Sequence, residues 1–183
     1  MSHVNIQRRN LLLAGGSFFA LGALTPKMAF ASLLKEEPRS LALNNLHTGE
    51  KLDTEYFNGQ DYVRKELTKI NHICRDFRRN EIANMDKRLF DQVSAIQQLI
   101  GCNAEVTVIS GYRSPATNEM LRKKSGGVAK KSYHMLGQAL DMRLEGVPLA
   151  EVRKAALSLK AGGVGYYPKS NFVHIDTGPV RSW

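Results

Sequence analysis

The sequence predicts a single α/β (α+β) domain that follows an N-terminal leader. Strand-like and helix-like patterns alternate along the chain, and neither an internal repeat nor a second domain is visible. Removing the first 31 of the 183 residues leaves 152, which is enough chain to enclose one sizeable core. We therefore expect one domain over residues 32–183.

The first 31 residues have the pattern of an export signal. Arg8-Arg9 precedes an apolar run from Leu11 to Leu24, and Ala29-Phe30-Ala31 supplies small residues for cleavage after Ala31. The run is shorter than the roughly 20 residues of a membrane-spanning helix, so we expect no stable membrane insertion. The paired arginines resemble a twin-arginine signal, which predicts contact with that export machinery and a mature protein in the periplasm. An ordinary secretion signal or an uncleaved anchor is the alternative.

The charge of the chain narrows the choice of partners. The whole chain carries a formal charge of +9, and the leader contributes three basic residues and no acid, so the mature protein retains +6. A basic exported protein suits an anionic polymer such as the cell wall. Export and the lack of a recognisable nucleic-acid motif argue against a nucleic-acid partner. The oligomeric state is left open.

The first half of the mature chain predicts a hairpin followed by two helices. Alternating patterns over Ser40–Leu46 and Lys51–Phe57, joined through Thr48-Gly49, indicate two paired strands. Apolar residues recur at helical spacing over Asp61–Arg78. Asp86 is suited to begin a second helix, which Gly101 would close.

Three residues of this half have no assigned chemistry. Cys74 and Cys102 fit no metal-binding spacing, and both a disulfide and two free thiols are compatible with an oxidising compartment. His47, in the hairpin turn, is expected to bond to the backbone, with a contact to substrate or to a functional side chain as the alternative.

The second half predicts a strand, a helix and a basic loop. The strand Val106–Ile109 leads to Arg113, and Ser114-Pro115 is a typical helix start. Arg113 at this corner can present a guanidinium fork to a substrate carboxylate or carbonyl, whereas a surface salt bridge is the alternative. The loop Gly126–Lys131 lacks the Gly-Lys-Ser/Thr triplet of a phosphate-binding loop, so we interpret it as a basic rim.

The remaining elements predict the rest of the domain. A strand is expected over Gln138–Leu144 and a helix over Pro148–Leu159. Two closing strands follow at residues 162–167 and 172–176, separated by a turn at 168–170.

Two histidines and an aspartate form a candidate metal site. His134 and Asp141 are seven residues apart, so a bend at Gly137 is needed to bring them together. Alternation places His174 and Asp176 on one face of their strand, where His174 can meet Asp141 if the two strands are neighbours. Two imidazoles and one carboxylate suit zinc, and three protein ligands leave a position for water. On spacing alone, unrelated polar residues in strands remain an alternative.

The residues around these positions resemble a known group of enzymes. Ser132-Tyr133-His134-x-x-Gly-x-Ala-x-Asp141, followed by Phe172-Val173-His174-Ile175-Asp176, is similar to the zinc peptidases that include lysostaphin, D-Ala-D-Ala peptidases and hedgehog relatives. Within this group the chain most resembles the MepK murein endopeptidases. Residues 43–50, 109–114, 126–134 and 161–168 carry the similarity across the whole mature chain.

The resemblance implies a fold, a cofactor and an activity. It implies a small central antiparallel sheet that carries one zinc ion, held by His134, Asp141 and His174. It also implies hydrolysis of amide bonds in the cross-links of peptidoglycan, including meso-diaminopimelate 3-3 links, during growth or remodelling of the cell wall. A D,D-carboxypeptidase that acts on stem-peptide ends, and a wall-binding protein with a structural zinc, are the alternatives.

The sequence departs from the group at the proton-transfer residue. Many members have a histidine two residues, or a glutamate three residues, before the last ligand, where this chain has Phe172 and Asn171. Asp176 is therefore either a general base or, as we favour, a group that orients His174. Arg113 is a candidate for oxyanion stabilisation. The candidate substrate-binding residues are Ser132, Tyr133 and Tyr166.

Overall fold

The computed structural model of the protein describes residues 36–183. The predicted leader over residues 1–31, with its cleavage site after Ala31, lies outside the described residues. Within the described range, no helix combines the length and the apolar character needed to cross a membrane.

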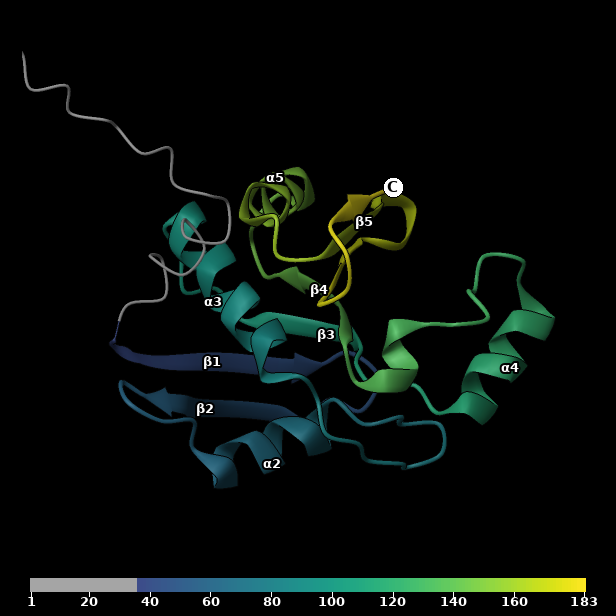
Figure 1. Cartoon of the computed structure of the whole chain (residues 1–183), viewed down its shortest axis with the longest axis horizontal. Coiled ribbons are helices and arrows are strands. Elements are labelled where there is room, and N and C mark those ends of the chain that lie inside the picture. The colour runs from purple at the N-terminus through teal and green to yellow at the C-terminus, as the bar shows by residue number, and fades with distance from the viewer. Residues whose placement is uncertain (1–35) are drawn as a thin grey trace, which may run out of the picture.

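The described chain forms one seven-stranded sheet with helices packed on it (Figure 1). The strands are β1 (Pro38–Asn45), β2 (Lys51–Asn58), β3 (Val106–Ser110), β4 (Ala139–Leu144), β5 (Gly163–Tyr167), β6 (Phe172–Asp176) and β7 (Arg181–Ser182). The helices are α2 (Arg64–Ile73), α3 (Lys87–Ile100), α4 (Pro115–Lys124) and α5 (Leu149–Leu159), with short 3-10 turns η1 (Tyr133–Leu136) and η2 (Pro168–Ser170). These elements confirm the predicted α/β fold class.

The sheet is larger than expected and mixed rather than wholly antiparallel. Its strand order is β2-β1-β3-β4-β6-β5-β7, in which β1 pairs with β3, and β5 with β7, in parallel. The chain between β1 and β3 contains β2, α2 and α3, and a long connection of this kind allows parallel pairing. The strands that carry the candidate site, β4 and β6, are antiparallel as predicted.

Alternation along the strands divides the sheet into a core face and a site face. On β4, Leu140 and Met142 are buried in the hydrophobic core, and on β6 Val173 and Ile175 join the same core. Residues from α2, α3 and α5 complete this core. Asp141 lies between Leu140 and Met142, so its side chain points to the opposite face. The helices thus support the sheet from behind the candidate site.

The helix ends follow the local signals, with one exception. The Asp86 side chain accepts a hydrogen bond from the backbone N–H of Arg88 at the start of α3, and Gly101 ends that helix with φ 76°. Ser114 likewise accepts from the N–H of Thr117 at the start of α4. The helix predicted over residues 61–78 is shorter, however, because the chain leaves α2 at Cys74.

The two cysteines and His47, to which the sequence assigned no chemistry, lie outside the candidate site and make structural contacts. Cys74 and Cys102 are both free, so the disulfide alternative is wrong. Burial raises the pKa of the Cys74 thiol to about 12, which keeps it protonated and unreactive. The His47 ring stacks on Phe77 with the ring centroids 4.3 Å apart, and its backbone N–H donates to the side chain of Asn45.

Asp76 joins the segment after α2 to the start of α4. Its carboxylate accepts hydrogen bonds from the Ser114 hydroxyl at 2.7 Å, the Ser114 N–H at 3.0 Å and the Arg78 N–H at 3.1 Å. Burial opposes ionisation, but the side chain of Thr117 together with these Ser114 and Arg78 donors holds the pKa of the Asp76 carboxyl below its ordinary value of 3.8. The contact fixes the corner that carries Arg113.

We expect Asp76→Asn to lower the free energy of unfolding by about 1–3 kcal/mol, because a charged acceptor of buried donors is lost. A depressed carboxyl pKa in the folded state contributes stability above the unfolded-state pKa, and this contribution disappears as the pH falls through the folded-state value. The difference in the free energy of unfolding between wild type and variant should therefore be largest at about pH 7 and smaller at about pH 3. Urea unfolding at both pH values measures it, and an equal difference at both would contradict the assignment.

Candidate metal centre

His134, Asp141 and His174 converge on the site face of the sheet. Asp141 on β4 and His174 on β6 are directly opposed in the antiparallel ladder, so the two strands are neighbours, as the sequence argument required for these residues to meet. His134 reaches them from η1. One ligand atom from each side chain lies within 4.8 Å of the others, and the residues are only 3%, 6% and 8% exposed. The three residues form a buried group that can hold a metal ion.

The bend at Gly137 brings His134 to this group. Gly137 ends η1 with φ 66°, a backbone conformation that favours glycine. A Cβ atom at this position would lie 2.3 Å from the backbone oxygen of Asn84, so a side chain has no room. The carbonyl of Gly137 also accepts a hydrogen bond from the N–H of Asp86 at 2.8 Å. These contacts explain why the chain can turn from η1 into β4 here.

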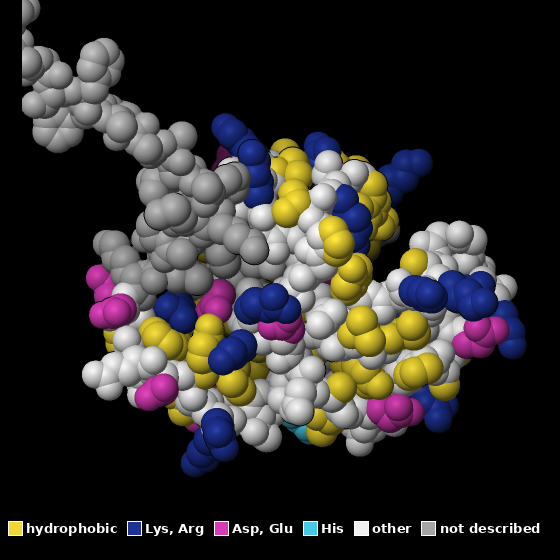
Figure 2. Space-filling model, in the orientation of Figure 1, with side chains coloured by type: hydrophobic (Ala, Val, Ile, Leu, Met, Phe, Trp, Pro, Cys, Tyr) yellow, Lys and Arg dark blue, Asp and Glu magenta, His cyan; other side chains and the backbone are white. Residues whose placement is uncertain are grey.

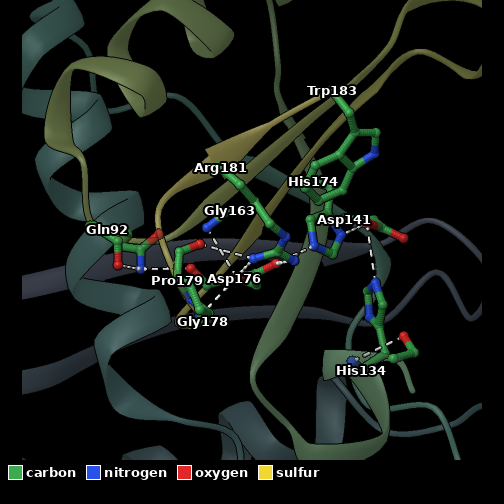
Figure 3. Close-up of polar contacts among 12 residues, drawn as sticks. Gln92, His134, Asp141, Gly163, His174, Asp176, Gly178, Pro179, Arg181 and Trp183 are labelled. Atoms are coloured by element: carbon green, nitrogen blue, oxygen red, sulfur yellow. Dashed lines mark hydrogen bonds and ion pairs between the residues drawn. The ribbon is translucent and has the colours of Figure 1, made fainter. Parts of the chain in front are cut away.

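Each imidazole has one nitrogen bonded to the protein and one facing Asp141 (Figure 3). His134 Nδ1 lies 2.7 Å from the carbonyl oxygen of Gly111, which leaves Nε2 at 3.3 Å from Asp141 Oδ1. His174 uses the opposite nitrogens: Nδ1 lies 2.8 Å from Asp141 Oδ1, and Nε2 lies 3.0 Å from Asp176 Oδ2. This arrangement fits a metal, because two unshared nitrogens and a carboxylate converge.

Electrostatics favour an ionised carboxylate at the centre. Burial by itself would raise the pKa of Asp141, but the neighbouring His134 and His174 hold that pKa well below its usual range. Deprotonated carboxylates and neutral imidazoles are the forms that bind metal ions.

Asp176 lies on the side of the His174 ring opposite Asp141. Its fully buried carboxylate accepts hydrogen bonds from the N–H groups of Gly163 at 3.0 Å and Gly178 at 2.9 Å. Arg181 adds a two-pronged ion pair at 3.1 and 2.5 Å. Although burial opposes it, contacts with His174, Arg181 and these N–H groups hold the pKa of Asp176 well below normal. The carboxylate is thus held against the His174 ring.

Arg113 lies beside Asp141 at the candidate centre. Its backbone N–H donates to the carbonyl of His134 at 3.1 Å, and its guanidinium lies 3.8 Å from Asp141 Oδ2. Weaker contacts join the guanidinium to Ser110 at 3.4 Å and Asn118 at 3.5 Å. The predicted corner therefore brings this cation to the candidate centre rather than to a surface salt bridge.

The three candidate ligands line a cavity of about 570 Å³. Ser132, Tyr133 and Arg113 line it with them, as does part of the predicted basic loop, including Lys131. Figure 2 shows further Lys and Arg side chains over the end of α4, where Arg122, Lys123 and Lys124 form the last turn. The cavity is thus bordered by positive charge.

Tyr166 does not line the cavity. On β5 it points to the core face, where Arg153 lies 4.9 Å from its ring centroid. Its neighbour Tyr167 points to the site face and lines the cavity instead. Sequence reasoning also missed Arg181 and Trp183, which reach the cavity from β7 and the residue after it. The alternation of β5 was the only signal for Tyr167, and β7 is too short for a periodic pattern.

Asn171 and Phe172 occupy the two positions where related enzymes have a proton-transfer residue. Asn171 occupies a turn with φ 53° after η2. The Phe172 ring stacks on Tyr167 with the centroids 4.5 Å apart. Among the described residues that line the cavity, Asp141 is the only one with a carboxylate side chain.

Comparison with known proteins agrees with the geometry of the site. The family profile described as "Peptidoglycan L,D-endopeptidase MepK" matches residues 34–183. The chain is 55% identical over 184 residues to the "Peptidoglycan L,D-endopeptidase MepK" of Escherichia coli (strain K12), with all of both chains covered. It is 45% identical over 185 residues to the "Probable peptidoglycan L,D-endopeptidase MepK" of Haemophilus influenzae, covering all of this chain and 98% of the relative. The chain therefore belongs to the MepK family of peptidoglycan L,D-endopeptidases.

Proposed function

We propose that this protein is a zinc-dependent peptidoglycan L,D-endopeptidase that hydrolyses cross-links between stem peptides. The observation that carries the proposal is the buried convergence of His134 Nε2, Asp141 and His174 Nδ1 at the wall of a large cavity. Membership of a family whose members are named for this activity supports it.

Zinc is the metal that the donor set supports best. Two imidazole nitrogens and one carboxylate oxygen suit it, and three protein ligands are typical of catalytic rather than structural zinc sites. When bound, zinc supplies a Lewis acid that lowers the pKa of a bound water toward 7 and polarises the scissile carbonyl.

The surrounding residues are suited to position the substrate. The Arg113 guanidinium, beside Asp141, is suited to bind a substrate carboxylate or the oxygen of the scissile carbonyl. Ser132 and Tyr133 form part of the cavity wall, where a stem peptide can lie. Asp176 orients His174 through Nε2 and so fixes which nitrogen is available to the metal.

The substrate and the location follow from the family and the leader. An L,D-endopeptidase cuts between centres of opposite chirality, a class that includes meso-diaminopimelate 3-3 links. The predicted twin-arginine leader supports delivery to the periplasm, where this substrate lies. The positive border of the cavity suits a polymer that carries carboxylates.

Digestion of isolated sacculi tests the function directly. We expect the purified protein to convert cross-linked muropeptides into monomers, and a chelator to stop the reaction until zinc is restored. Muropeptide chromatography measures the products. Shortened stems with unchanged cross-linking would instead identify a D,D-carboxypeptidase. Unchanged sacculi would identify a wall-binding protein with a structural metal.

We expect His134→Ala to lose both bound zinc and cleavage, because it removes one of three metal ligands. Wild-type protein should contain about one zinc per chain by elemental analysis. His72→Ala is the matched control, since His72 lies on α2 outside the cavity and should keep both properties. A His134→Ala protein that still released muropeptides would contradict the assignment.

Asp176→Asn should weaken zinc affinity by about 10–100-fold, because the neutral amide orients the His174 ring less firmly. Competition with a chromogenic chelator measures the affinity. Asp53→Asn on the exposed side of β2 serves as the control for loss of one aspartate charge. If Asp176→Asn bound zinc as tightly as wild type and lost only cleavage, Asp176 would be a proton-transfer group rather than an orienting one.

A further inference from the structure

Trp183 lies over the candidate metal centre at the end of the chain. Its backbone N–H donates to the carbonyl of Val164 at 3.2 Å, and its carbonyl accepts from the N–H of Tyr166 at 3.1 Å. The indole lies beside His174, with the ring centroids 5.3 Å apart (Figure 3). A Cβ on Gly165 would come within 2.8 Å of this indole. The glycine therefore provides the space in which the indole sits.

The indole is bonded to Tyr167. Trp183 Nε1 donates a hydrogen bond to the Tyr167 hydroxyl oxygen at 2.7 Å. The Tyr167 ring is also stacked on Phe172. Because an indole N–H can only donate, the tyrosine oxygen is the acceptor, and its own proton must point to a different partner. One aromatic stack and one hydrogen bond thus hold a cavity-lining hydroxyl with a proton free to donate.

Amide hydrolysis needs such a donor. When water attacks a carbonyl, the carbonyl oxygen acquires negative charge, and donors already held in place stabilise that charge most effectively. Tyr167 and Arg113 share the cavity.

The other tyrosine in the cavity is less well placed for this role. The Tyr133 ring packs against Gly178, where a Cβ would lie 2.6 Å from the Tyr133 hydroxyl oxygen. Arg181 stacks on the same ring, with the guanidinium carbon 5.0 Å from its centroid. Tyr133 is therefore directed at the loop after β6, whereas the Tyr167 hydroxyl is held in the wall of the cavity by Trp183.

We propose that Tyr167 is a catalytic residue that donates a hydrogen bond to the oxyanion formed at the scissile carbonyl, and that Trp183 is a positioning residue for its hydroxyl. The inference rests on the proposed endopeptidase function and adds a residue to it. The phenolic proton stays on Tyr167 throughout, so the role requires no proton transfer. It differs from that of Arg113 because Tyr167 is neutral and is oriented by a single donor.

Kinetics of three variants on a purified cross-linked muropeptide test the proposal. Tyr167→Phe should lower kcat by about 100-fold with little change in KM, as expected when one oxyanion donor is removed. Trp183→Phe keeps an aromatic ring and loses the N–H, so kcat should fall by about tenfold. The double variant should be no slower than Tyr167→Phe alone, because both changes act through one hydroxyl. Tyr62→Phe, outside the cavity, is the control for loss of a tyrosine hydroxyl.

A second measurement does not depend on turnover. A phosphinic analogue of the cross-link carries tetrahedral anionic oxygens, and its affinity for Tyr167→Phe, measured by calorimetry, should fall by about the same factor as kcat. Zinc content should equal that of wild type in every variant.

The outcomes separate this inference from the proposed function. Wild-type protein that leaves the muropeptide intact would overturn both. If wild type cleaves, and Tyr167→Phe keeps kcat within about twofold or binds the phosphinic analogue equally well, only the role of Tyr167 is overturned. Loss of zinc from Tyr167→Phe would also overturn it, because the residue would then support the metal site.

Discussion

The antiparallel pairing of β4 with β6 is the constraint on which the rest of the site depends. It sets Asp141 opposite His174 while Leu140, Met142, Val173 and Ile175 turn toward the helices. A shift of one residue would move every side chain of one strand to the other face, burying a charged carboxylate in the core and exposing its apolar neighbours. The hydrophobic core therefore enforces the register that brings the candidate ligands together.

Around this pair, most polar contacts serve to orient rather than to react. Gly111 and Asp176 each bind one nitrogen of a histidine, and Asp176 is in turn held by Arg181 and two backbone N–H groups. A buried carboxylate with so many donors stays ionised and cannot easily move. The two histidines then present different nitrogens, Nε2 and Nδ1, to one point. A metal ion there meets a prearranged set of donors.

Local signals in the sequence predicted strands β1 to β6, the ends of α3, the start of α4 and the bend at Gly137, but not the two-residue strand β7. Each depends on neighbours in the chain, which a sequence displays directly. The parallel pairing of β1 with β3 and the early end of α2 depend on distant contacts, the latter on Asp76 with Ser114. At the site, the resemblance identified the candidate ligands. It did not show whether Tyr166 or Tyr167 points toward the site. Two adjacent tyrosines that follow several glycines do not reveal which face of the strand each side chain occupies.

The helices that form the core lie behind the sheet, and the candidate centre lies on the other face. A cross-link belongs to a continuous net and offers no free end that could be threaded into an enclosed tunnel. A catalytic centre on the side without that helical layer can be approached sideways, by a strand of polymer that enters and leaves in opposite directions. Because the helices of the core cover only the opposite face of the sheet, the candidate centre is open to cross-links inside the polymer network and does not require a free peptide end.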